Sequence, residues 1–146
     1  MSYEQLDLDT QLCFPLHAAS RAVTRAYGEL LAESGLTYPQ YLVMLALWKA
    51  EGSLSVGELG ERLRLDSGTL TPLLKRLEAA GRLTRHRSPE DERRVLVSLT
   101  PEGLALRDAV AEVPGRLGEI VGLGREDSEK LKSLLMTVMT SLDGHR

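Results

Sequence analysis

The feature that most constrains the fold is a change in the spacing of apolar residues at Gly81. Before this glycine, the segment SGTLTPLLKRLEAAG (residues 67–81) places leucines three and four positions apart, as on one buried helix face. After it, residues 82–87 and 94–100 alternate apolar and polar side chains, and the charged turn SPEDER joins them. The pattern therefore predicts a helix that leads into a two-stranded hairpin. The leucines of the helix stripe are Leu70, Leu73, Leu74 and Leu77.

The N-terminal third of the chain is also expected to be helical. Apolar residues recur three and four positions apart across residues 12–31, which predicts one long helix. Asp9 or Thr10 has a side chain suited to cap its start, and Gly35 is expected to end it. All six aromatic residues of the chain lie at or before Trp48, so we expect the aromatic part of the core there.

Start signals place the next three helices. Thr37 followed by Pro39 is typical of a helix start, and Ser55 with Glu58 has the spacing of a capping box. Pro72 suits a third helix that begins between residues 67 and 69, because a proline deeper in a helix removes a hydrogen bond.

The C-terminal part is expected to contain two further helices. Thr100 and Pro101 mark the start of the first, which is expected to run to the Pro114-Gly115 pair. The second begins near Asp127 and carries a stripe of apolar residues that is larger than a small domain covers by itself. We expect this stripe to form a dimer interface, with packing inside the chain as the alternative. It consists of Leu131, Leu134, Leu135, Val138, Met139 and Leu142.

Composition limits the class of protein. A chain of 146 residues is most simply one domain, so residues 1–146 are treated as one. Its one cysteine cannot form an internal disulfide, which favours a cytoplasmic location. The sequence has no apolar run of membrane-spanning length and no basic segment typical of a secretory signal at its start, so no membrane partner is expected.

The distribution of charge is more informative than the net charge of −3. Residues 62–94 contain nine Lys and Arg against five Asp and Glu, whereas the rest of the chain is acidic. A basic block inside an acidic protein indicates one face that binds a polyanion. The alternative is an ordinary charged surface in contact with solvent.

The order helix, short turn, helix and charged hairpin predicts a winged helix-turn-helix, a mainly α fold with a small β-hairpin wing. Small hydroxyl residues near the start of the second helix let it enter a major groove, and arginine at a hairpin tip suits a narrow minor groove. We therefore expect the chain to bind double-stranded DNA. The alternative is a structural helix pair beside a solvated hairpin. The expected helix contacts are Ser67, Thr69, Thr71, Pro72, Lys75 and Arg76, and those of the wing are Arg85, Arg87, Arg93 and Arg94.

Within the single domain, three parts are expected. Residues from about 37 to 100 form the winged helix-turn-helix, and residues from about 9 to 35 and 101 to 146 form N- and C-terminal dimerisation helices. A homodimer places two recognition helices on successive major grooves, so the preferred operator is expected to be an inverted repeat.

Several segments resemble a known family. LSVGELGERL, LDSGTLTPLLKRLEAAG and RSPEDERRVLVSLTPEG resemble the MarR-type winged-helix regulators. LCFPLHAASR and LTYPQYLVMLALW are similar to the organic-hydroperoxide-sensing repressors of that family, the OhrR type. The resemblance implies a homodimeric repressor whose reactive cysteine is oxidised by organic hydroperoxides, which releases DNA. It also implies that Arg93 enters the minor groove and that Asp91 orients it.

The cysteine of this segment is Cys13, in the expected first turn of the N-terminal helix. The partial positive charge of a helix N-terminus stabilises a thiolate, which is the form that a peroxide oxidises. Leu12, Phe14 and Leu16 make the surroundings apolar, as an alkyl hydroperoxide requires. A small buried hydrophobic role for the cysteine is the alternative.

Hydrogen-bond donors to the thiolate are expected from His17 and from two tyrosines. Tyr27 lies on the same helix face as Cys13, but about 21 Å along the axis, so contact requires two copies packed antiparallel. The resemblance implies that Tyr27 and Tyr38 reach the cysteine from the partner subunit. The chain departs from the family at His17, where a tyrosine is common, which leaves the route that transmits oxidation open.

With no second cysteine, oxidised Cys13 must react with a low-molecular-weight thiol or a backbone amide. One alternative is a MarR-type regulator that responds to a small aromatic ligand in the dimer crevice, with Cys13 incidental. Two others are a thiol peroxidase and a winged helix that binds protein. We expect no metal, because the histidines at positions 17, 86 and 145 lack ligand spacing. We also expect no cofactor and no enzyme, because the sequence shows no glycine loop that binds phosphate and no Ser-His-Asp arrangement.

Overall fold

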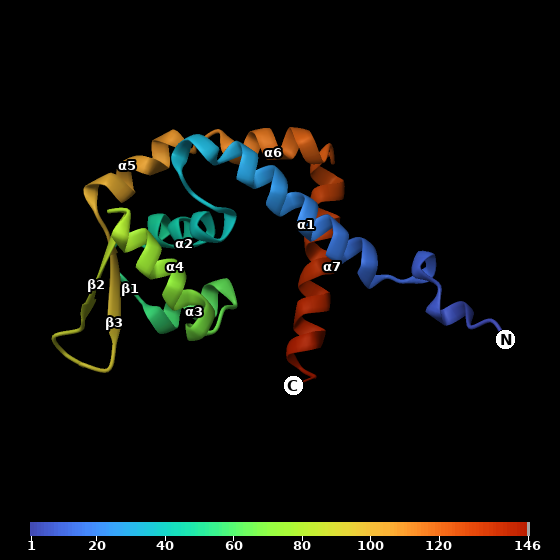
Figure 1. Ribbon diagram of the computed structural model, residues 1–146, viewed down its shortest axis with the longest axis horizontal. Helices are drawn as coiled ribbons and strands as arrows, with labels where there is room; N and C mark the ends of the chain where they lie inside the picture. Colours follow the sequence, from blue (N-terminus) through green and yellow to red (C-terminus); the bar gives the residue numbers. More distant parts are fainter. Residues whose placement is uncertain (146) are drawn as a thin grey trace. The chain divides into compact units, whose positions relative to one another are not determined.

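The computed structural model describes residues 1–145 and divides into two compact units, Met1–Val113 and the chain from Pro114 onward. Figure 1 shows a mainly helical chain with one small sheet, which confirms the expected fold class. The first unit contains η1 (Glu4–Leu6), η2 (Leu8–Thr10), α1 (Cys13–Leu30), η3 (Ala32–Ser34), α2 (Tyr38–Lys49), β1 (Leu54–Ser55), α3 (Val56–Leu63), α4 (Ser67–Ala79), β2 (Leu83–Arg87), β3 (Val95–Leu99) and α5 (Pro101–Ala109). The helices α6 (Val113–Val121) and α7 (Arg125–Asp143) follow.

The sheet has three antiparallel strands in the order β1-β3-β2. The expected hairpin is β2 and β3, whose register pairs Leu83 with Leu99 and Arg87 with Val95. The third strand, β1, pairs Leu54 with Val97 and was not expected from the sequence. Two residues are too few to show an alternating pattern, so the pairing depends on β3 lying beside them.

Most of the expected helix starts are confirmed. Thr37 and Ser55 both form capping boxes, in which each side chain accepts a hydrogen bond from the backbone three residues on and the residue there returns one. Thr100 caps α5 through the backbone N–H of Gly103. α4 begins at Ser67, as Pro72 indicated, and the side chain of Asp66 caps it.

The start and end of α1 differ from the expectation. The expected caps Asp9 and Thr10 lie in η2, and the hydroxyl of Thr10 donates to the carbonyl of Asp7 at 2.9 Å. α1 begins at Cys13 without a side-chain cap, because this short turn uses the capping side chains locally. α1 ends at Leu30, and Gly35, with φ of +75°, closes the following η3 turn instead.

The helix that starts at Pro101 is also shorter than expected. It ends at Ala109, and α6 then begins at Val113, so Pro114 lies in the first turn of a helix and not in a break. A proline is tolerated there because the first N–H groups of a helix have no partner inside it. α7 begins at Arg125, close to the expected Asp127.

Much of the stripe of α7 is exposed. Leu134 and Leu142 expose 65% and 63% of their surface, and Leu131 exposes 46%. Within residues 1–145, no helix has both the length and the apolar character needed to cross a membrane.

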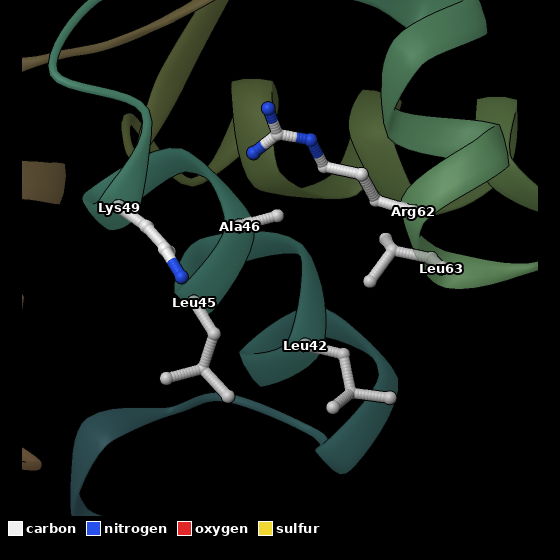
Figure 2. Close-up of a pocket in the computed structure, with 6 residues that line it drawn as sticks. All are labelled: Leu42, Leu45, Ala46, Lys49, Arg62 and Leu63. Carbon is white, nitrogen blue, oxygen red and sulfur yellow. The ribbon is translucent and has the colours of Figure 1, made fainter. Parts of the chain in front are cut away.

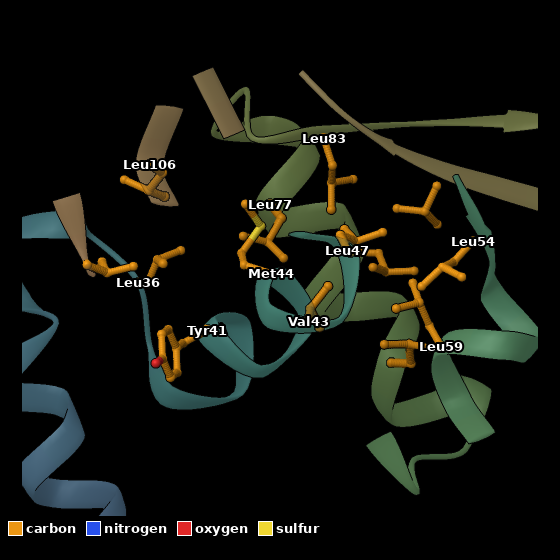
Figure 3. Close-up of a cluster of buried hydrophobic side chains, with 14 of the residues drawn as sticks. Leu36, Tyr41, Val43, Met44, Leu47, Leu54, Leu59, Leu77, Leu83 and Leu106 are labelled. Carbon is orange, nitrogen blue, oxygen red and sulfur yellow. The ribbon is translucent and has the colours of Figure 1, made fainter. Parts of the chain in front are cut away.

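The hydrophobic core lies among α2, α3, α4, α5 and the sheet (Figure 3). Leu70, Leu74 and Leu77 of α4 are each exposed by 1% or less, and Leu73 packs half-buried beside them. They meet Met44 and Leu47 of α2 and Leu59 of α3 in one cluster. The predicted stripe is therefore the side of α4 that holds it to the domain, and it leaves the other side in solvent.

Gly103 allows the start of α5 to approach Arg82, in the turn between α4 and β2, closely. A Cβ atom at this position would overlap the backbone carbonyl of Arg82. The same contact region contains a hydrogen bond of 3.0 Å from the indole of Trp48 to the Gly103 carbonyl.

The Gly103→Ala variant is therefore expected to lose about 1–3 kcal/mol of unfolding free energy, measured by urea titration with circular dichroism. Gly57→Ala is the control, because its Cβ would meet only an ordinary contact at 3.9 Å. Equal stability of the two variants would contradict the close approach.

Candidate functional site

The N-terminal half of α4 presents small polar side chains to solvent. Asp66 accepts a hydrogen bond of 2.7 Å from the backbone N–H of Thr69, and such hydrogen bonds lower the pKa of its carboxyl group. This cap leaves Ser67 and Thr69 exposed, with Thr71 half-buried behind them. Nothing bulky therefore prevents this end of the helix from approaching another molecule.

The remaining residues predicted on this helix lie further along the same element. Pro72, Lys75 and Arg76 are exposed. Pro72 is inside the helix, where its missing N–H leaves the carbonyl of Gly68 without its usual helical partner. The structure thus brings all six predicted recognition residues onto one helix whose other face is the buried leucine stripe.

Arg85 of the wing is held against α4. The carboxylate of Glu78 accepts hydrogen bonds from the Arg85 backbone N–H at 2.8 Å and from its guanidinium Nη2 at 3.0 Å. These bonds lower the pKa of Glu78. Arg85 therefore fixes the angle between the wing and the helix, and its charge is already paired.

The turn of the wing is ordered around Ser88, which is buried although polar. Its hydroxyl accepts from the backbone N–H groups of Glu90 and Asp91 at 3.3 and 3.4 Å. Asp91 in turn accepts from the backbone N–H and the guanidinium Nε of Arg93, at 3.1 and 3.3 Å. The side chain of Arg93 is 92% exposed, so a fixed carboxylate orients a guanidinium that extends into solvent.

The other two wing arginines are anchored. Arg87 donates to the backbone carbonyl of Glu92 at 2.7 Å, and Arg94 forms an ion pair of 2.7 Å with Glu58 of α3. Thr71, Arg93 and Arg94 line a shallow pocket of about 450 Å³ between α4, α3 and the wing. The predicted DNA-facing residues therefore adjoin one another in the first unit.

Cys13 is the first residue of α1 and is exposed. Phe14 and Leu16 beside it expose 46% and 41% of their surface, and His17, one turn on, is exposed too. The thiol is therefore accessible in the single chain, with an apolar surround open to solvent. Within the single chain, the cysteine is therefore not part of the hydrophobic core.

Tyr27 and Tyr38 lie together at the other end of α1. Their rings stack with centroids 4.2 Å apart and planes within 5°, and Tyr41 lies 5.5 Å from Tyr27. Burial, and then the neighbouring Tyr38 and Tyr41, raise the pKa of Tyr27. Burial also raises the pKa values of Tyr38 and Tyr41. Their hydroxyls therefore stay protonated at neutral pH and are available as hydrogen-bond donors.

Among residues 1–145, no group of three or more His, Cys, Asp or Glu side chains has an arrangement that could hold a metal ion.

Comparison with known proteins places these features in a family. The family model described as transcriptional regulator SarA/Rot matches residues 25–110. The chain is 48% identical over 141 residues to the organic hydroperoxide resistance transcriptional regulator of Bacillus subtilis strain 168, covering 97% of this chain and 93% of that protein.

The chain belongs to the OhrR-like winged-helix regulators of the MarR family.

Solved structures agree with this assignment. The structure of reduced AbfR bound to DNA, a protein of Staphylococcus epidermidis, is similar with a TM-score of 0.81 and 35% identity, covering 99% of this chain and 98% of that one. PcaV of Streptomyces coelicolor, in complex with its natural ligand, gives a TM-score of 0.85 and 28% identity, covering 97% and 99%. This OhrR-like regulator is thus a transcription factor and not an enzyme.

Sequence reasoning missed two contacts of the site. The bond between Glu78 and Arg85 joins a helix to a strand, and no periodic pattern of residues marks it. Tyr41, the third ring of the tyrosine cluster, had a signal that was available, because it lies three residues after Tyr38 and shares its helix face.

The Glu78 contact generates a prediction about pH. Because the pKa of Glu78 is lowered in the folded state, its stabilising effect is fully present above the ordinary value of 4.5 and is lost as pH falls through the folded value. The Glu78→Gln variant is expected to be less stable than the parent protein at neutral pH, and the difference is expected to shrink as the pH falls below 4.5. Urea titrations across this range measure it, with the exposed Glu61→Gln as control. A difference independent of pH would argue against a charged Glu78 as the cause.

Proposed function

We propose that this OhrR-like regulator is a homodimeric repressor that binds operator DNA and releases it when an organic hydroperoxide oxidises Cys13. The observation that carries the proposal is an exposed thiol at the first position of α1, in a chain 48% identical to a regulator of organic hydroperoxide resistance. The protein acts in the cytoplasm, where its DNA is.

The proposed DNA interface consists of α4 and the wing. The exposed start of α4 enters the major groove with Ser67 and Thr69, and Lys75 and Arg76 meet phosphates. Arg93 enters the adjacent minor groove, oriented by Asp91. Arg85 positions the wing through Glu78 and is not itself a base contact. The likeness to AbfR, solved in a complex with DNA, supports DNA binding by this chain.

Dimerisation is assigned to the helices outside the DNA-binding part, about residues 9–35 and 101–146, with about residues 37–100 as the winged helix-turn-helix. The exposed apolar side chains of α7 support this role. A two-fold dimer presents two copies of α4, which favours an inverted-repeat operator.

The proposed sensor combines Cys13 of one subunit with Tyr27 and Tyr38 of the other. In the single chain, the two phenols stack against each other and Cys13 is exposed at the far end of α1. If two copies of α1 pack antiparallel, the cysteine of each copy lies near the phenols of the other. Protonated phenols donate hydrogen bonds to a thiolate, and the first turn of α1 adds N–H groups without a side-chain cap. His17 is a further donor one turn away.

The proposed chemistry is a two-electron oxidation. The thiolate sulfur attacks one peroxide oxygen, an S–O bond forms and the O–O bond breaks. The sulfur is oxidised to a sulfenic acid, and the peroxide is reduced to an alcohol whose oxygen takes a proton from solvent. A low-molecular-weight thiol then displaces water from the sulfenic acid and forms a mixed disulfide, because the chain has no second cysteine.

The mixed disulfide adds bulk where two subunits meet, which separates the dimerisation helices and changes the spacing of the two α4 helices.

A second candidate function is a regulator that responds to a small aromatic ligand in the dimer crevice. The likeness to PcaV, solved in complex with its natural ligand, favours keeping this alternative. The two differ in chemistry, since a ligand acts reversibly and leaves the mass of the chain unchanged.

The sensing role is tested with the Cys13→Ser variant. It is expected to bind the operator as the parent protein does, and to remain bound after treatment with an alkyl hydroperoxide and a small thiol. Gel-shift assays read the binding, and intact mass reads the adduct on the parent chain. Release of the Cys13→Ser protein by peroxide would show that another group is the sensor.

The wing assignment is tested with Arg93→Ala. Loss of this exposed guanidinium is expected to weaken operator binding about tenfold or more and to flatten the dependence of affinity on salt by about one log–log unit per site. Fluorescence anisotropy at several salt concentrations measures both. Arg107→Ala is the matched control for charge, because it removes an arginine from α5, outside the proposed DNA face, and sedimentation checks that this variant is still a dimer. An identical effect of the two substitutions would contradict a specific role for Arg93.

A further inference from the structure

The N-terminal arm, residues 1–12, is an ordered segment whose apolar side chains do not pack against the hydrophobic core of its own chain. Its side-chain hydrogen bonds join residues 4–11 to one another, for example Gln11 Nε2 to the carbonyls of Gln5 and Asp7 at 2.9 and 2.8 Å. All twelve residues are exposed. Leu6, Leu8 and Leu12 expose 76%, 56% and 83% of their surface. An exposed apolar segment with a fixed shape indicates a surface that it covers.

An apolar pocket with basic side chains beside it lies between α2 and α3 (Figure 2). It has a volume of about 540 Å³, and its apolar wall contains Leu42, Leu45, Ala46 and Leu63. Lys49 and Arg62 stand beside this wall. Neither cation takes part in an ion pair with any of the described residues 1–145. The arm carries the complementary charges Glu4, Asp7 and Asp9 between its leucines.

The pocket is also continuous with the proposed subunit contact. Tyr38, Leu42, Leu45 and Lys49 follow one another at four-, three- and four-residue steps, so they form one stripe along α2. Lys49 lies about 16 Å from Tyr38 along this helix. The eight steps from Leu12 back to Glu4 span about 16 Å at the rise of 3₁₀ turns. An arm that starts at Tyr38 is therefore long enough to reach Lys49.

We propose that the N-terminal arm of each subunit docks in the α2–α3 pocket of its partner. The proposal rests on the proposed dimer, in which Cys13 of one copy meets Tyr38 of the other. Leu12 and Leu8 cover Leu42 and Leu45, and the acidic residues of the arm pair with Lys49 and Arg62. The arm thereby ties the segment before the reactive thiol to α3, the first helix of the helix-turn-helix.

The test is disulfide trapping between different subunits in a Cys13→Ser background. Chains carrying Leu8→Cys and chains carrying Leu45→Cys are co-expressed and treated with a mild oxidant. A covalent dimer on a non-reducing gel, in much higher yield than with either chain alone, is expected. The control pair combines Leu8→Cys with Ala80→Cys, an exposed position after α4 that lies outside both the pocket and the proposed dimerisation helices.

Sedimentation of the same samples separates the possible failures. A non-covalent dimer that traps no better than the control pair would overturn arm docking and leave the proposed homodimer standing. A monomer would overturn both. As a second measurement, the Lys49→Glu, Arg62→Glu double variant is expected to raise the dimer dissociation constant about threefold to tenfold at low salt. An unchanged constant would exclude the charge pairing.

Discussion

Burial of the leucine stripe of α4 is the interaction on which the rest of the molecule depends. Leu70, Leu74 and Leu77 anchor this helix to α2 and α3, and they fix which of its faces solvent can reach. A helix surface can be presented to a partner with little loss of order only if the opposite surface is already held. The hydroxyl residues of α4 are therefore exposed because the opposite face of the helix is buried in the core, and not only because they are polar.

Electrostatic pairing then divides the basic residues into two groups. Arg85 and Arg94 are held by Glu78 and Glu58, so their charges brace the wing against α4 and α3. Arg93 is oriented by Asp91 but extends into solvent. The same residue type is thus held in an ion pair with another element at two positions and extends into solvent at a third.

The sequence was sufficient for features that depend on local periodicity or capping. These include the stripe of α4, the cap at Thr37, the capping box at Ser55, and the hairpin with its charged turn. It was insufficient where other segments decide the outcome. β1 exists because β3 lies beside it, and the expected caps of α1 were wrong because the preceding residues form their own turn. For the candidate site, the residue types were readable, whereas the stacking of Tyr27 on Tyr38 and the pairing of Arg85 required the fold.

The hydrogen bond from Trp48 to Gly103 has a practical consequence. It places the chain's one tryptophan at the joint between α2 and α5, where the DNA-binding part meets the helix that leads out of it. Indole emission is sensitive to the polarity and hydrogen bonding of its surroundings. The unlabelled protein therefore carries an intrinsic optical reporter at this joint, so a rearrangement there can be followed in real time without attaching a dye.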